Sequence, residues 1–152
     1  MRATNFIIGF ILLTLTTLVT NSFATIGEVS ITSGSAVIDR QDGDKDIEVK
    51  KELDIFSYDT VKTGNGKVGI VFIDDTRVDI TEHSKLIIDE FVYDPNTNTG
   101  SLSLKASLGT VRYASGQIAK NSAQNVKITT PTATIAVRGT DFAMTVNEIG
   151  GS

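Results

Sequence analysis

Cysteine is absent from this sequence of 152 residues, and histidine occurs only once, as His83. Without cysteine, disulfide bonds, thiol chemistry and zinc–thiolate sites are excluded, so burial of apolar side chains must hold the fold together. One histidine is too few for a multi-histidine metal centre, and no Gly-x-Ser-x-Gly motif supplies a nucleophile for it to activate. We therefore expect His83, which lies between two predicted strands, to occupy a solvent-facing turn.

Positive charge is also scarce. The 14 Lys and Arg residues are outnumbered by 18 Asp and Glu residues, which gives a net charge of −4. Binding to a phosphate backbone needs a clustered positive surface. The composition therefore argues against nucleic acid and against an anionic membrane surface as partners.

Only one long apolar run is present, over residues 6–19, and it follows the positively charged Arg2. Ser22-Phe23-Ala24 then places small residues at the two positions that a signal peptidase reads. The run is shorter than the about 20 residues that a transmembrane helix needs. We expect a signal peptide over residues 1–24 and a periplasmic or secreted mature chain, with no membrane span after cleavage. An uncleaved N-terminal anchor is the alternative.

From residue 25 onward the dominant hydrophobic period is two. The alternating apolar positions are Val68, Ile70 and Phe72; Val78 and Ile80; Leu102 and Leu104; Val111 and Tyr113; Val126 and Ile128; Ala133, Ile135 and Val137; and Phe142, Met144 and Val146. Such runs bury one face of a strand, and turn residues such as Asn65-Gly66 separate them, whereas no window shows helical periodicity. We predict one all-β domain over residues 25–152. A β-solenoid or β-helix-like arrangement of short strands is favoured, with a twisted β-sandwich as the alternative.

Several acidic pairs invite a catalytic interpretation. Neighbouring carboxylates in a strand point to opposite faces, so they are not expected to share a site. Asp74-Asp75 is typical of a turn between two strands, and Leu86–Tyr93 is predicted to be a strand with a bulge near Asp89-Glu90. A polysaccharide hydrolase that uses Asp74, Asp79 or Asp89 is therefore the least favoured function. No residue is assigned a catalytic role.

Two further motifs resemble ligand-binding loops. Asp42, Asp44 and Asp46 have the spacing of a calcium loop, but the positions that would carry Gly and a bidentate Glu hold Ile47 and Leu53. A solvated hairpin tip is favoured, and weak calcium binding stays open. The glycine-rich segment 64–69 has the letters of a dinucleotide loop, yet a strand follows it where a helix is required. Its Asn-Gly pair predicts a two-residue hairpin turn, and no cofactor is expected.

The candidate binding residues are Arg138, Thr140 and Asp141, which surround Gly139 between two alternating runs. Glycine at this position suggests a tight connection or a positive φ angle. Arg138 is expected to pair with a carboxylate and fix the last strands in place. Alternatively, its guanidinium group binds an anionic ligand.

Several short segments share their order with a known family. They are Gly34-Ser35-Ala36-Val37; Asp59-Thr60-Val61-Lys62-Thr63-Gly64; Phe72-Ile73-Asp74-Asp75-Thr76; Gly109-Thr110-Val111; Thr130-Pro131; and Val137-Arg138-Gly139-Thr140-Asp141-Phe142. Together they resemble the FecR-type domain, over about residues 34–146. The resemblance implies a β-helical or compact twisted β module. In the regulator type of that family, this module receives a signal from an outer-membrane transporter and a cytoplasmic head controls a sigma factor. The present chain is more similar to the stand-alone exported form, because it begins with a signal peptide.

The resemblance implies an exported, non-enzymatic FecR-like module that binds or senses through protein or ligand contacts, without cofactor or metal. An outer-membrane or envelope protein and cell-wall polysaccharide are the expected partners. The alternative function is that of a structural or adhesive cell-envelope domain. The closing Gly150-Gly151-Ser152 is typical of the start of a linker, so the chain is then expected to be a fragment of a longer surface protein.

Overall fold

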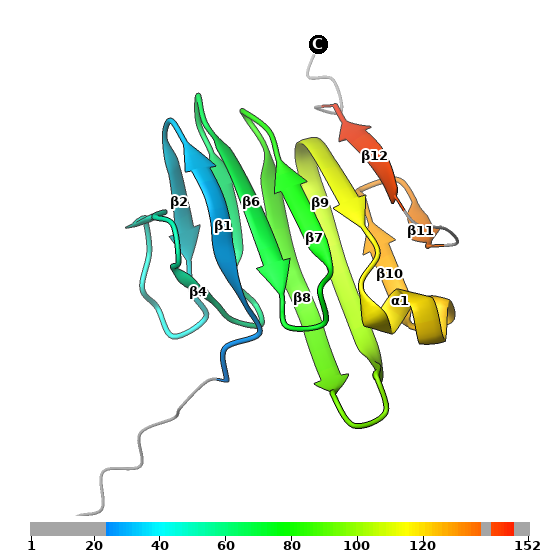
Figure 1. The fold of residues 1–152 in the computed structure, drawn as a ribbon. Helices are drawn as coiled ribbons and strands as arrows, with labels where there is room; N and C mark the ends of the chain where they lie inside the picture. The colour runs from blue at the N-terminus through cyan, green and yellow to red at the C-terminus, as the bar shows by residue number, and fades with distance from the viewer. Residues whose placement is uncertain (1–23, 138–140, 148–152) are drawn as a thin grey trace, which may run out of the picture.

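The computed structural model describes residues 24–137 and 141–147. These residues form strands joined by short turns, with one short helix after the longest strand (Figure 1). The elements are β1 (Gly27–Ser33), β2 (Ala36–Asp39), β3 (Ile47–Glu48), β4 (Asp54–Ile55), β5 (Thr60–Thr63), β6 (Lys67–Phe72), β7 (Arg77–Ile80), β8 (Lys85–Asp94), β9 (Thr99–Ala114), α1 (Gln117–Ser122), the 3-10 turn η1 (Ala123–Asn125), β10 (Val126–Thr129), β11 (Thr134–Ala136) and β12 (Asp141–Val146).

The strands form one curled sheet that folds back on itself into two layers. Along the sheet the order is β3-β2-β5-β8-β9-β7-β6-β1-β4. The long strand β9 belongs to both layers, because residues 99–108 pair with β8 and residues 111–114 pair with β7. We call β4, β1, β6, β7, β12 and the second half of β9 the front layer. The back layer is β3, β2, β5, β8, β10, β11 and the first half of β9 (Figure 1).

The chain crosses between the layers at one shared corner: from β1 to β2, from β5 to β6, from β7 to β8, and within β9. Hydrogen bonds join neighbouring crossings. The Gly64 N–H donates to the Ser35 carbonyl at 2.9 Å, and the Thr110 N–H donates to Ser84 Oγ at 3.1 Å. Gly109 has a φ of +82°, and a Cβ atom there would collide with Ser84. Glycine is therefore required where β9 turns the corner.

The apolar core fills the space between the two layers. Alternate residues of each strand point into it, as the period of two predicts, and Phe72 of the front layer stacks on Phe91 of the back layer with ring centroids 5.3 Å apart. Tyr113, on the second half of β9, is fully buried as well. Because both layers contribute to this core, burial on one strand depends on strands far away in the sequence.

The all-β class is confirmed, but the described strands do not form a solenoid. Strands in the coils of a solenoid run parallel, whereas here every described pair of strands is antiparallel except β9 with β10. Although no window of the sequence shows helical periodicity, one short helix, α1, spans Gln117–Ser122. Six residues are too few to give a recognisable helical period. No helix within the described ranges is long and apolar enough to cross a membrane.

Two turn predictions have opposite outcomes. Asp74-Asp75 does join the antiparallel strands β6 and β7, as predicted. Asn65-Gly66 is not a hairpin turn, because β5 pairs with β2 and β8 while β6 pairs with β1 and β7. It is a crossing at the corner, where the exposed His83 donates its backbone N–H to the Gly64 carbonyl at 2.9 Å. The solvent-facing turn predicted for His83 is confirmed.

The predicted bulge in β8 is confirmed, and it overturns a second expectation. The register with β9 shifts between Ile88 and Glu90. As a result Asp89 and Glu90 both lie on the outer face of the back layer, where each accepts a hydrogen bond from a serine of β9. The expectation that these two carboxylates point to opposite faces is therefore wrong. It holds for a regular strand and fails at a bulge.

Candidate functional site

The candidate site lies at the C-terminal end of the sheet, where the predicted binding residues fall. Arg138 and Thr140 lie outside the described residues, so the two interpretations of Arg138 stay predictions. Asp141 is described, and it is the exposed first residue of β12. The site is therefore built from β12 and its neighbour β9.

Strand β12 pairs antiparallel with β9 along its whole length, from Asp141 opposite Ala114 to Val146 opposite Gly109. Within the described part of the chain, no strand pairs with its other side. In an antiparallel strand the backbone groups of alternate residues point to opposite sides. Every second residue of β12 therefore presents its N–H and C=O groups at an open edge of the front layer, which is the arrangement that accepts a further strand.

The side chains of β12 alternate between an apolar and a polar row. Phe142 and Met144 are half-buried against the core, and the Phe142 ring lies 5.3 Å from the ring of Tyr113. On the outer face, Thr145 Oγ1 lies 2.9 Å from Thr110 Oγ1, which links β12 to β9 through their hydroxyl groups. The apolar row therefore ends at the open edge with its side chains only partly covered.

A shallow depression of about 340 Å³ lies beside β12, lined by Arg112, Asp141, Phe142 and Ala143. Arg112 stands on β9 directly opposite Ala143 on one side and Asp79 on the other. Among the described residues Arg112 forms no ion pair within 4.0 Å. A guanidinium group, a carboxylate and an aromatic ring thus meet at the edge that is open to another strand.

The C-terminal end is held in place by Asp74, which is fully buried in the turn between β6 and β7. Its Oδ1 accepts the Thr76 N–H at 3.0 Å, and its Oδ2 accepts the Thr76 hydroxyl at 2.8 Å and the Ile118 N–H at 3.2 Å. The Gln117 N–H donates to the Asp74 carbonyl at 2.7 Å. Asp74 therefore fastens helix α1, which leads into β10, to the front layer, and its oxygens are occupied by the protein itself.

The three carboxylates considered for hydrolysis do not meet. Asp74 is buried beneath α1, Asp79 is exposed on the front layer, and Asp89 is exposed on the back layer. The core separates Asp79 from Asp89, and the oxygens of Asp74 are taken by the protein itself, so the three do not form a shared catalytic site.

The loop with calcium-like spacing at the N-terminal end is held by a lysine. Lys62 Nζ lies 2.8 Å from Asp39 and 3.3 Å from Asp46, and this ammonium group lowers the pKa of Asp39. Asp42 Oδ1 accepts the Asp44 N–H at 3.2 Å, which closes a local turn. No group of three acidic or histidine side chains in the described ranges is placed to hold a metal ion. The loop joins the antiparallel strands β2 and β3, so the predicted hairpin tip is confirmed, and weak calcium binding stays a prediction.

Sequence reasoning missed a buried carboxylate in the same region. Asp59 has a side chain only 1% exposed, and it accepts the Phe56 N–H at 3.0 Å. The Arg40 Nε lies 4.0 Å from Asp59 Oδ1, which is an ion-pair distance but too long for a hydrogen bond. Burial outweighs the attraction of Arg40 and raises the pKa of Asp59. In the sequence, only its position two residues before the apolar Val61 hints at burial.

The fold defines a small, mostly antiparallel all-β module whose described residues leave one edge of β12 open. The family model described as FecR protein matches residues 59–152, which is more than half of the chain. The chain therefore belongs to the FecR protein family, as the motifs from Asp59 onward indicated. The segment around Gly34 lies outside the matched range. No curated protein and no solved structure is found to be similar to the chain.

Proposed function

We propose that this chain is an exported, non-enzymatic sensing or binding module that acts by contact with another protein of the cell envelope. Membership of the FecR protein family supports a role in signalling or sensing. The apolar run and small-residue motif within residues 1–24 support export to the periplasm or beyond. An outer-membrane or envelope protein is the proposed partner.

The observation that carries the proposal is the open edge of β12. Proteins usually protect the outer strands of a sheet by making them short, charged, bulged or proline-containing. The six residues of β12 contain no proline, no lysine and no register shift, and their one charged residue, Asp141, stands at the start of the strand. A partner that adds an extended segment to this edge would gain backbone hydrogen bonds, and it would cover the half-buried Phe142 and Met144.

Proline substitutions along β12 test the proposal. Because alternate residues point to opposite sides, only one of Ala143→Pro and Met144→Pro removes an N–H group from the open edge. The other removes a hydrogen bond to β9 and is expected to destabilise the fold. The variant that stays folded should lose the partner in affinity capture from a periplasmic fraction. Glu48→Pro, on the short edge strand β3, is the matched control and should retain it.

The proposal is contradicted if the folded β12 variant captures the same proteins as the unmodified chain. It is also contradicted if neither the unmodified chain nor the Glu48→Pro control captures an envelope protein.

A second candidate function is that of a structural or adhesive domain of the cell envelope. The observation that favours it is the polar outer face of the back layer, which suits polysaccharide. Under this proposal the chain binds purified cell wall, and proline in β12 leaves that binding unchanged.

A further inference from the structure

The outer face of the back layer carries a polar trough that is separate from the β12 edge. It is defined by Asp89, Glu90, Ser101, Ser103, Lys105 and Lys127, on the neighbouring strands β8, β9 and β10. Two adjoining depressions make it up. One has a volume of about 150 Å³ and contains Glu90 and Lys127, and the other has a volume of about 560 Å³ and contains Asp89 and Lys105.

The bulge in β8 gives the trough two carboxylates side by side. Ser103 Oγ donates to Asp89 Oδ2 at 3.3 Å, and Ser101 Oγ donates to Glu90 Oε1 at 3.4 Å. Among the described residues, the second oxygen of each carboxylate has no hydrogen-bond partner. The bulge disrupts the pairing of β8 with β9 at this point, and bulges often re-aim side chains at functional sites. Two acceptors therefore point outward from one wall of the trough.

The opposite wall and the floor supply the donors. Lys127 stands beside Ser103 on β9, and Ser103 stands beside Glu90 on β8. Neither Lys127 nor Lys105 forms an ion pair within 4.0 Å in the described ranges, although the carboxylates of β8 lie one strand from Lys105 and two strands from Lys127. Ammonium, hydroxyl and carboxylate groups thus alternate across three strands without neutralising one another.

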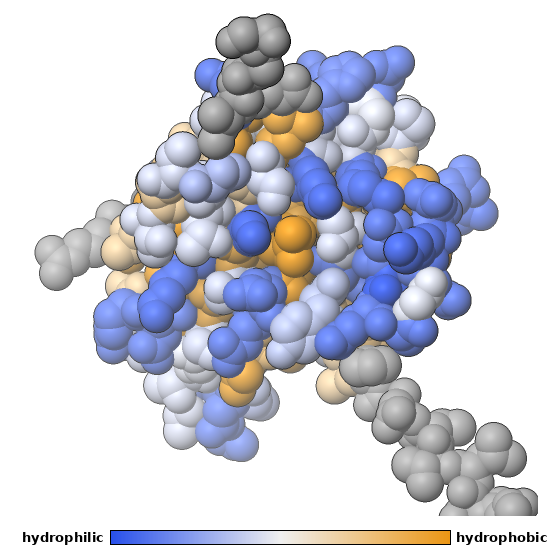
Figure 2. All heavy atoms as spheres, turned by 180° about the vertical axis from the view of Figure 1, so that it is seen from behind, coloured by the Kyte–Doolittle hydropathy of each residue, from blue (hydrophilic) through white to orange (hydrophobic). Residues whose placement is uncertain are grey.

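The arrangement of ammonium, hydroxyl and carboxylate groups in the trough favours one class of ligand. Two lysines and two carboxylates balance, so the trough does not attract a polyanion such as nucleic acid. A sugar hydroxyl both donates and accepts a hydrogen bond, so neighbouring hydroxyls can use the carboxylates and the ammonium groups together. On β8, Val92 is 56% exposed and Ile87 is half-buried, and both offer apolar contact to the C–H face of a sugar ring. Figure 2 shows the side of the molecule behind that of Figure 1, where hydrophobic residues are visible among hydrophilic ones.

We propose that the polar trough binds a neutral, linear glycan chain. The ligand lies across β8, β9 and β10, with its hydroxyls on Asp89, Glu90 and the two lysines. This site rests on the second candidate function and deepens it, because it names the residues and the class of glycan on the same outer face. Retained binding to purified cell wall without hexasaccharide binding would overturn the trough alone. A protein with both sites could contact an envelope protein and a polysaccharide at once.

The test is a titration of the ¹⁵N-labelled protein with chitohexaose and, separately, with cellohexaose, followed by NMR. We expect saturable shifts of the backbone amides of residues 101–105 and 126–130 with at least one of the two hexasaccharides. Asp89→Asn and Glu90→Gln each keep an oxygen for the serine hydroxyl and remove the charge that strengthens the bond to the ligand. Each should weaken binding about tenfold, as expected for the loss of a charge-assisted hydrogen bond.

Asp79→Asn is the matched control, because Asp79 is an exposed carboxylate opposite Arg112 on the front layer. It should leave the titration unchanged. The proposal is overturned if neither hexasaccharide shifts these amides at millimolar concentration, or if the three variants weaken binding equally. A Gly-Ser peptide of similar length that shifts the same amides more strongly than the glycans would also overturn it, in favour of a polar peptide.

Discussion

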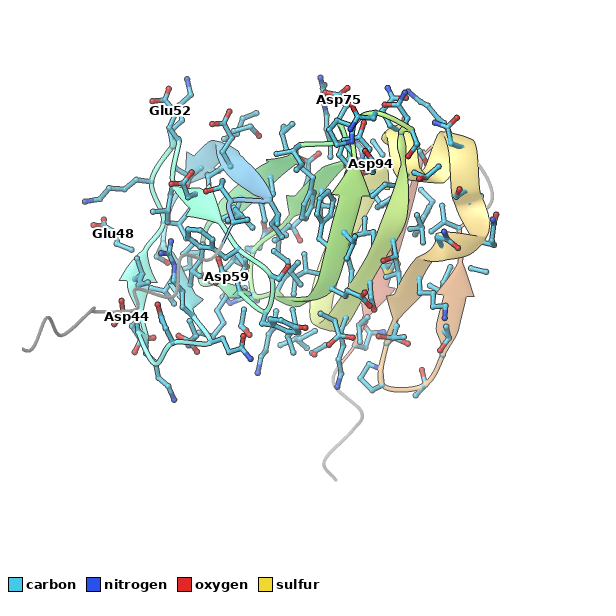
Figure 3. All side chains as sticks on the ribbon, turned by 90° about the horizontal axis from the view of Figure 1, so that it is seen from below. Asp44, Glu48, Glu52, Asp59, Asp75 and Asp94 are labelled. Carbon is cyan, nitrogen blue, oxygen red and sulfur yellow. The ribbon has the colours of Figure 1, made fainter. Side chains whose placement is uncertain are left out.

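The two ends of the curled sheet differ in how they meet solvent. At the N-terminal end the outer strands β3 and β4 have two residues each, and both contain an exposed acidic residue, Glu48 and Asp54. Figure 3 shows Asp44, Glu48 and Glu52 at this end, away from β10 and β11. At the C-terminal end β12 offers six residues with an apolar row, and its exposed acidic residue, Asp141, stands only at the first position. One sheet therefore has an end that resists strand addition and an end that is open to it.

The two ends also differ in how they are fastened. The N-terminal loop is tied by the partly exposed Lys62 to two carboxylates. The C-terminal end is tied through α1 to the buried Asp74. A polar group costs far more to disrupt when water cannot replace the lost partner. The comparison therefore predicts that similar substitutions have large effects at one end and small effects at the other.

The largest effect is expected for Asp74→Ala. Removal of the carboxylate leaves the N–H groups of Thr76 and Ile118 buried without a partner, and α1 loses its attachment. We expect a loss of about 3–5 kcal/mol in the free energy of unfolding, measured by urea denaturation. Asp75→Asn is the control. Asp75 is exposed with a φ of 67°, which asparagine tolerates. Equal losses in the two variants would show that Asp74 does not fasten this end.

A matched pair of aromatic substitutions separates stability from binding. Phe142 at the C-terminal end packs on Tyr113, and Phe56 at the N-terminal end lies 4.5 Å below the guanidinium of Arg40. Because each ring is partly buried, truncation to alanine should cost about 2 kcal/mol at either end. Only Phe142→Ala should also reduce capture of the partner. Loss of capture in both variants would place the binding surface elsewhere.

Local patterning was sufficient to predict much of the fold. Alternation identified Ile70, Val78 and Tyr113 as core residues, and all three are buried. The break in alternation at Asp89-Glu90 identified the bulge, because an extra residue leaves a visible change of phase. These features depend on residues that are close together in the sequence, so a single sequence contains them.

Long-range pairing could not be predicted in the same way. An Asn-Gly pair looks the same in the sequence whether it forms a hairpin turn or a crossing between the two layers. At Asn65-Gly66 the outcome depends on β5 pairing with β2 and β8. Helix α1 is fastened by an aspartate 44 positions earlier in the chain. In the candidate site, Asp141 was predicted as a binding residue. That β12 forms an open edge follows only from the order of all the strands.

Replacement of the buried Asp59 at the N-terminal end should have a smaller effect on the free energy of unfolding, and this effect should depend on pH. Its folded-state pKa is raised, so the folded state holds the proton more tightly than the unfolded chain. The native protein should therefore lose stability relative to Asp59→Asn as the pH rises from about the ordinary value of 3.8 through the raised pKa. Above that range the difference should be constant. Urea denaturation of both proteins between these pH values measures it. A gain of relative stability with rising pH would mean that pairing with Arg40 outweighs burial.

The smallest effect is expected for Lys62→Met, which removes the ion pairs of the N-terminal loop. Lys62 lowers the pKa of Asp39, and Asp39 raises the pKa of Lys62. The contribution of Asp39 is present above its ordinary pKa and is lost as the pH falls through the lowered value. That of Lys62 is present below its ordinary pKa and is lost as the pH rises through the raised value. Because Lys62 is 36% exposed, we expect a loss of only about 0.5 kcal/mol at neutral pH and low salt.

The salt dependence of the loss in stability tests whether the ion pairs of Lys62 are weaker than the buried attachment through Asp74. An exposed ion pair is screened, so the effect of Lys62→Met should disappear in urea denaturation at 1 M salt, whereas that of Asp74→Ala should persist. Lys50→Met is the matched control, because Lys50 lies 3.2 Å from Glu48 with both side chains largely exposed, and it should change nothing measurable. A salt-resistant loss in Lys62→Met would mean that the N-terminal end is fastened as firmly as the C-terminal end. The difference between the ends would then lie in their edges alone.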